Sequence, residues 1–208
     1  MINNSNKIIF HRLKVGPLET NCYIFGCAKT KKVAIIDPGA NAESIQHLID
    51  SEELQPIFII NTHGHLDHIG ANKDFNLPVY IHEDDAVALT NPDRNLSGVM
   101  GCDYVSQPAS MMLADGDVVE IGEVSLKVMH IPGHTPGGIA LLYDKLLLSG
   151  DSLFQESIGR TDLPYGNNDD LIKAINNKLM KLDDDVVVYP GHGEKTTIGH
   201  ERKNNHWL

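Results

Sequence analysis

Three histidines and one aspartate stand within six consecutive residues of this 208-residue chain, at His63, His65, Asp67 and His68. A His-x-His pair can direct two imidazoles into one centre, and the carboxylate and imidazole that follow can point into a neighbouring one. Nitrogen and oxygen ligands of this mix suit zinc, iron or manganese. The spacing therefore indicates a metal-binding loop, with a neighbouring centre for a second ion.

A structural role is the alternative for each of these residues taken singly. A lone histidine after a strand is more often a surface residue or a hydrogen-bonded core residue than a ligand. A tag-like histidine tract does not fit, because glycine, leucine and isoleucine are interleaved with the histidines. Four metal-type residues at this density favour metal binding over chance clustering.

The apolar run at 56–61, directly before this loop, predicts a fully buried strand. The arrangement recurs where three later strands end in turns rich in glycine or proline, which present His134, Asp151 and His192. Taken alone, Asp151 can cap a turn and His192 can be an exposed loop residue. Together with the first loop these turns supply five histidines and two aspartates, about the inventory for two metals with open coordination positions.

The hydrophobic pattern predicts alternating strands and helices in one domain. The segment 91–112 is irregular, and it is either a lid beside the site or a plain surface excursion. Strands are expected at 7–15, 20–26, 33–36, 56–61, 79–81, 118–121, 124–130, 139–143, 146–148 and 186–189, and helices at 42–51, after Asp67, at 83–89, at about 168–181 and from Ile198.

Composition narrows the class of protein. The hydrophobic share of 41% is ordinary for a globular chain, and the net charge of -11 argues against binding to nucleic acid or to anionic membranes.

The chain has an odd number of cysteines, Cys22, Cys27 and Cys102, which favours a reducing compartment. We expect each of them to be a small buried or partly buried residue. The sequence shows neither a secretory signal nor a membrane span, so a cytoplasmic location is expected.

The ordered motifs resemble those of the metallo-β-lactamase-fold hydrolase superfamily. These are Thr-His-Gly-His-Leu-Asp-His at 62–68, Pro-Gly-His-Thr at 132–135, Ser-Gly-Asp at 149–151 and Pro-Gly-His-Gly at 190–193. The stretches at 151–164 and 190–202 are most similar to the small glyoxalase II-like (hydroxyacylglutathione hydrolase-like) subgroup. The resemblance implies an α/β fold, a four-layer αββα sandwich with the site at one edge of its two sheets.

The resemblance also implies a ligand set for two divalent ions, most simply zinc, with iron or manganese as alternatives. His63, His65 and His134 would hold the first ion, and Asp67, His68 and His192 the second, with Asp151 bridging both. The implied reaction is hydrolysis of a thioester by a hydroxide held between the metals, with Asp67 and Asp151 as the catalytic carboxylates.

Three further residues are weaker candidates for a role around the ligands. Asp37 stands at a strand end, where it can hold the metal loop or merely cap a turn. Arg160 and Asp162 belong to the subgroup motif, and we expect a buried structural ion pair between them. His82 and His130 are expected to be structural.

The implied substrate is a small thioester, most simply an S-2-hydroxyacylglutathione. The longer glyoxalase II enzymes carry a helical C-terminal domain that binds glutathione, whereas 1–208 predicts only the metal domain, so glutathione contacts cannot be assigned. One alternative is a mono-iron persulfide dioxygenase that uses His63, His134 and Asp151. A non-catalytic metal-binding module and a β-lactamase are further alternatives, and the oligomeric state is left open.

Overall fold

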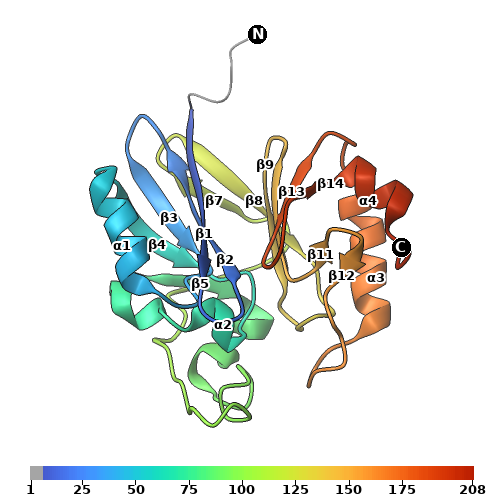
Figure 1. The fold of residues 1–208 in the computed structure, drawn as a ribbon, viewed down its shortest axis with the longest axis horizontal. Helices are drawn as coiled ribbons and strands as arrows, with labels where there is room; N and C mark the ends of the chain where they lie inside the picture. Colours follow the sequence, from blue (N-terminus) through green and yellow to red (C-terminus); the bar gives the residue numbers. More distant parts are fainter. Residues whose placement is uncertain (1–6) are drawn as a thin grey trace.

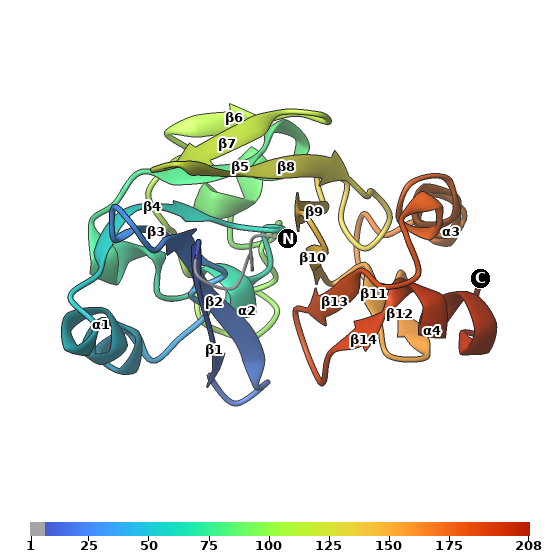
Figure 2. The ribbon, with the colours of Figure 1, turned by 90° about the horizontal axis from the view of Figure 1, so that it is seen from above.

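Two six-stranded sheets face each other across the molecule, as Figures 1 and 2 show. This computed structural model describes residues 7–208. In spatial order the first sheet contains β1 (Ile8–Val15), β2 (Thr20–Cys27), β3 (Lys32–Ile36), β4 (Gln55–Ile60), β5 (Val79–His82) and β6 (Met111–Leu113). The second sheet contains β14 (Thr196–Thr197), β13 (Val187–Pro190), β10 (Leu146–Gly150), β9 (Ile139–Tyr143), β8 (Val124–His130) and β7 (Val118–Ile121).

Helices cover the outer face of each sheet (Figure 2). The helix α1 (Ala42–Ser51) lies on the first sheet, and α3 (Asn168–Asn177) and α4 (Ile198–Asn204) lie on the second. The shorter elements are α2 (Leu66–Ile69), the 3-10 helices η2 (Asn72–Phe75), η3 (Glu83–Thr90) and η4 (Leu179–Lys181), and a ribbon of β11 (Leu153–Phe154) and β12 (Ser157–Ile158).

Three apolar layers hold these elements together. The central layer lies between the sheets and joins Phe25 and Ile60 of the first sheet to Leu126 and Leu141 of the second. The outer layers lie between each sheet and its helices. Burial on both faces is why the inner strands β2 and β3 are buried almost throughout, whereas β7 at the sheet edge alternates between exposed and buried residues. The result is the predicted four-layer αββα sandwich.

The helices bury one face each, as their sequence spacing predicts. Ile45 and Ile49 of α1 stand four residues apart and are both buried, and Leu171 and Ile175 repeat this spacing in α3. Asn167 is the N-cap of α3, and its side chain accepts hydrogen bonds from the backbone amides of Asp169 and Asp170. This cap satisfies two of the amides that lack a partner in the first turn.

The structure differs from the sequence prediction in several details. The strands β6, β11, β12 and β14 are only two or three residues long, too short to produce a hydrophobic period. The helix expected over about 168–181 ends at Asn177 and is followed by η4. Cys22 and Cys27 are buried as expected, but Cys102 is exposed in the irregular segment, so that prediction was wrong for Cys102. Over residues 7–208, none of the helices combines the length and apolar character needed to cross a bilayer.

Removing a large ring from the layer between the sheets should destabilise the fold. Phe25 is fully buried there, so Phe25→Ala should lower the free energy of unfolding by about 3–5 kcal/mol through lost burial and a residual cavity. Urea denaturation measures the change. Val118→Ala on the exposed face of β7 is the control and should change the free energy by no more than about 0.5 kcal/mol. Equal effects of the two substitutions would contradict the assigned core.

Candidate metal centre

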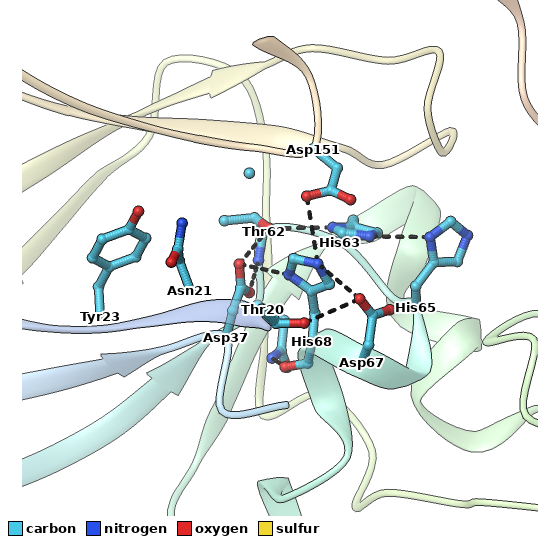
Figure 3. A network of polar contacts seen from close by, with 12 residues as sticks. Thr20, Asn21, Tyr23, Asp37, Thr62, His63, His65, Asp67, His68 and Asp151 are labelled. Atoms are coloured by element: carbon cyan, nitrogen blue, oxygen red, sulfur yellow. Dashed lines mark hydrogen bonds and ion pairs between the residues drawn. The ribbon is translucent and has the colours of Figure 1, made fainter. Parts of the chain in front are cut away.

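All seven predicted ligands come together at one edge of the sandwich, where strands from both sheets end. Figure 3 shows five of them, His63, His65, Asp67, His68 and Asp151. The first sheet supplies the loop after β4, with His63 to His68. The second sheet supplies His134 between β8 and β9, Asp151 directly after β10, and His192 after β13. The strands β10 and β13 are parallel neighbours, which places the last two ligands side by side.

The first trio is His63, His65 and His134. The Nδ1 atom of His65 lies 3.1 Å from Nε2 of His63 and 3.0 Å from Nε2 of His134. All three side chains are buried. Nitrogens that bind one zinc ion at about 2.0–2.1 Å in a tetrahedron lie roughly 3.3 Å apart, so the trio already has the spacing of a ligand set.

The second trio is Asp67, His68 and His192. Nε2 of His192 lies 3.3 Å from Nε2 of His68 and 3.1 Å from Oδ2 of Asp67. The Asp67 Oδ2 atom lies 3.5 Å from Nε2 of His68. Their three ligand atoms therefore also converge on one point. This spacing suits one imidazole-and-carboxylate metal site beside the first.

Asp151 stands between the two trios. Its Oδ2 lies 3.6 Å from Nε2 of His134, in the first trio, and 3.5 Å from Nε2 of His192, in the second. Its Oδ1 is buried and receives no hydrogen bond from any described residue, although it is 3.5 Å from Nε2 of His68. A buried carboxylate oxygen without a hydrogen bond is costly unless it meets a cation. The residues therefore fit a pair of metal ions that share Asp151.

The electrostatics of the trios differ. Burial, together with the neighbouring histidines, holds the pKa of His63 well below its usual value and lowers the pKa of His65 to about 3, so both rings are neutral and present free electron pairs. Burial also opposes charge on His68, but the carboxylates of Asp151, Asp67 and Asp37 outweigh it and raise its pKa to about 10. The same carboxylates that favour the proton on His68 would also attract a metal ion. A metal ion bound by the second trio would therefore displace this proton.

A cavity opens directly onto both trios. Its volume is about 680 Å³, and ligands from each trio line it, including His65, Asp67, His134 and His192. The remaining walls come from residues 95–100 on one side and 154–164 on the other. A molecule in this cavity can therefore reach both metal positions.

The Metallo-beta-lactamase superfamily model matches residues 15–192, which includes every one of these ligands. The chain belongs to the metallo-β-lactamase superfamily. It is 34% identical over 204 residues to the hydroxyacylglutathione hydrolase GloC of Haemophilus influenzae, covering 94% of this chain and 96% of that protein. The BLEG-1 B3 metallo-β-lactamase structure matches with a TM-score of 0.90 at 38% identity, over 96% of this chain and 99% of that one. The structure of TTHA1623 in a di-iron-bound form matches with a TM-score of 0.81 at 32% identity, over 95% of this chain and 100% of that one.

Asp37 ties the metal loop of this superfamily member to the end of β3, as Figure 3 shows. One carboxylate oxygen accepts the Thr62 backbone N–H at 2.7 Å, and the other accepts the Thr62 hydroxyl at 2.6 Å and lies 3.0 Å from Nδ1 of His68. The Thr62 oxygen is in turn 3.2 Å from Nδ1 of His63. Protons held on these two Nδ1 atoms leave both Nε2 atoms free for metal. Asp37 therefore holds the loop and is more than a turn cap.

Main-chain carbonyls orient the ligands that the second sheet supplies. Nδ1 of His134 lies 2.7 Å from the Arg160 carbonyl oxygen, and Nδ1 of His192 lies 3.0 Å from that of Leu18. Each carbonyl can only accept, so each Nδ1 must donate and each Nε2 faces the metal position. Arg160 thus contributes through its backbone.

Two buried residues that position the ligand loops were missed in the sequence. The Asp85 carboxylate accepts the N–H of Gly64, between the first two ligands, and the N–H of Gly137, just after His134. The Asn21 amide donates to the carbonyls of Pro190 and Gly193, on either side of His192. Their sequence contexts, an acidic helix and a strand, gave no signal for this long-range role.

Other expectations for the surroundings have mixed outcomes. Arg160 and Asp162 do form a bidentate pair at 2.8 Å, but the side chains are 61% and 69% exposed. The expectation of a buried pair was therefore wrong, because the loop that carries them lies at the surface. His82 and His130 stack with ring centroids 3.9 Å apart, and Nε2 of His130 lies 2.8 Å from the Pro136 carbonyl. Their structural role stays a prediction, since with Asp84 they also form a group that could hold a metal ion.

Replacing the Asp37 carboxylate should weaken metal binding. In Asp37→Asn the amide has one accepting oxygen for three donors, so the loop and the His68 ring lose their fixed orientation. We expect the zinc affinity to fall by about 10- to 100-fold. Competition with a fluorescent chelator measures the affinity, and circular dichroism checks the fold. Asp50→Asn, at the exposed end of α1, is the control, and a wild-type affinity in Asp37→Asn would contradict the role of Asp37.

Proposed function

We propose that the protein is a binuclear metal-dependent hydrolase of thioesters, with an S-2-hydroxyacylglutathione as the best single substrate. The observation that carries the proposal is Asp151 between two complete ligand trios at the base of an open cavity. The similarity to hydroxyacylglutathione hydrolase GloC over nearly the whole of both chains supports the substrate class.

The chemistry follows from what these residues would hold. Two divalent ions bound here would lower the pKa of a water molecule between them and polarise the thioester carbonyl. Asp67 lines the cavity, and its Oδ2 is held by the Thr20 hydroxyl at 3.2 Å and by His192 at 3.1 Å. Although burial opposes it, the charges of His68 and His192 lower the pKa of Asp67, so the carboxylate stays ionised and can orient the attacking water. A thiolate leaves readily, so the site needs no strong general acid.

The alternative reactions are separated by what each requires. A mono-iron dioxygenase needs only His63, His134 and Asp151, whereas the convergence of Asp67, His68 and His192 favours a second ion. A purely structural metal site is closed by protein ligands, whereas these trios face a cavity. The likeness to the BLEG-1 B3 metallo-β-lactamase makes β-lactam hydrolysis the second candidate.

We also propose that the protein is cytoplasmic and that it binds neither nucleic acid nor membranes. The support is the net charge of -11, together with three cysteines that are all free thiols.

Metal content and turnover together test the reaction. Protein purified without added metal should contain close to two divalent ions per chain and should cleave S-lactoylglutathione, because both trios are complete. Elemental analysis and thiol release measure the two quantities. One iron per chain, with oxygen consumed on glutathione persulfide and no thioester cleavage, would contradict the proposal. Turnover of a chromogenic cephalosporin without thioester cleavage would favour the second candidate.

Loss of a metal ligand should abolish activity and leave the fold. Asp151→Ala and His65→Ala should each lower kcat/KM by more than about 100-fold, since loss of even an outer partner costs 10- to 100-fold. Circular dichroism should stay native, because the three apolar layers are untouched. Asp185→Ala, at the exposed surface, is the matched control. Full turnover in both ligand variants would refute the site.

A further inference from the structure

The cavity above the metal ligands has almost entirely apolar walls. One wall comes from the irregular segment, with Leu96, Val99 and Met100, and the facing wall comes from the ribbon and the loop after it. Apart from the metal ligands, the apolar residues of the walls are Leu18, Leu66, Leu96, Val99, Met100, Phe154, Ile158, Leu163 and Pro164. This composition favours an apolar group in the cavity.

Positive charge is scarce on the same walls. Arg160 is the one cationic side chain among the described residues that line the cavity outside the metal ligands, and Asp162 neutralises it through two hydrogen bonds of 2.8 Å. Glutathione carries two carboxylates and an ammonium group. Those charges find no partner of opposite sign on the walls, so a glutathione moiety belongs outside, in solvent.

The segment that forms the first wall is anchored, although its tip is exposed. The buried Asn95 side chain donates to the carbonyls of Ala88 and Tyr104, and the main-chain carbonyl of Asn95 accepts the N–H of Leu66 in the metal loop. The Arg94 guanidinium lies 3.7 Å above the Tyr165 ring, which directly follows the facing wall in the chain. The first wall is therefore tied to the metal loop and to the chain that carries the facing wall.

Two apolar side chains at the tip remain in water. Val99 is 81% exposed and Met100 is 60% exposed, and both line the cavity. Covering such side chains with an apolar group of a substrate is favourable, and the flexible methionine adapts to its shape. A lactoyl group offers one methyl for this contact, whereas an aryl or medium-length alkyl group offers several apolar carbons.

We infer that the cavity selects thioesters by a large apolar acyl group, such as an aryl or a medium-length alkyl chain, and that Met100 is a specificity-determining residue for that group. This inference rests on the proposed function, since it concerns the acyl part of the same substrate. The thiol carrier stays at the mouth and contributes little to selection.

Binding of glutathione thioethers tests this without turnover, because the thioether cannot be hydrolysed. Calorimetry should show that S-hexylglutathione binds at least about tenfold more tightly than S-methylglutathione, as several buried methylenes predict. Met100→Gln keeps the length of the side chain but not its apolar character, and it should reduce this ratio at least about threefold. Met112→Gln is the matched control, since Met112 is 62% exposed on β6 and does not line the cavity.

The kinetic counterpart compares S-mandeloylglutathione with S-lactoylglutathione, and kcat/KM should favour the aryl substrate by at least about tenfold. A smaller ratio in either experiment, or a ratio that Met100→Gln leaves unchanged, overturns the inference. Turnover of S-lactoylglutathione without a preference for the aryl substrate refutes the apolar selection but leaves the proposed hydrolase supported. Tight binding of S-hexylglutathione without turnover of either thioester refutes the proposed hydrolase and leaves the apolar cavity supported.

Discussion

The Asp37 carboxylate is the contact on which the rest of the site depends. It sits at the end of β3 with a left-handed backbone conformation, at a φ of 52°, and reaches across to the loop that follows β4. Through Thr62 it orients a ligand of the first trio, and directly it orients His68 of the second. Both ligand trios thus share one buried anchor, and each of its two carboxylate oxygens contacts the metal loop.

The two sheets contribute unequally to each trio, and their packing is therefore part of the ligand geometry. The first sheet gives each trio two ligands from one loop, and the second gives each a single histidine plus the shared Asp151. Asp85 and Asn21 reach from the first half of the chain to the loops that carry His134 and His192. The apolar layer between the sheets sets the separation that these polar contacts bridge.

The sequence predicted most of the fold, because long apolar strands and helices with buried pairs four residues apart leave a strong local period. It also singled out Asp37 at a strand end, but left open whether this residue holds the loop or caps a turn. It could not reveal Asp85, whose partners are backbone amides 21 and 52 residues away. Nor could it establish that Arg160 and Asp162 are exposed, because local charge pairing looks the same in a core and at a surface.

The ligands of each trio lie far apart in the chain, from His63 to His134 in the first and from Asp67 to His192 in the second. During protein synthesis the first ligand loop is made early, whereas His192 is made only after β13. A partly synthesised chain can offer only incomplete coordination to passing metal ions, whatever their identity. Full coordination is thereby coupled to formation of β13, and an ion held by either trio would close a chain loop that joins the two sheets.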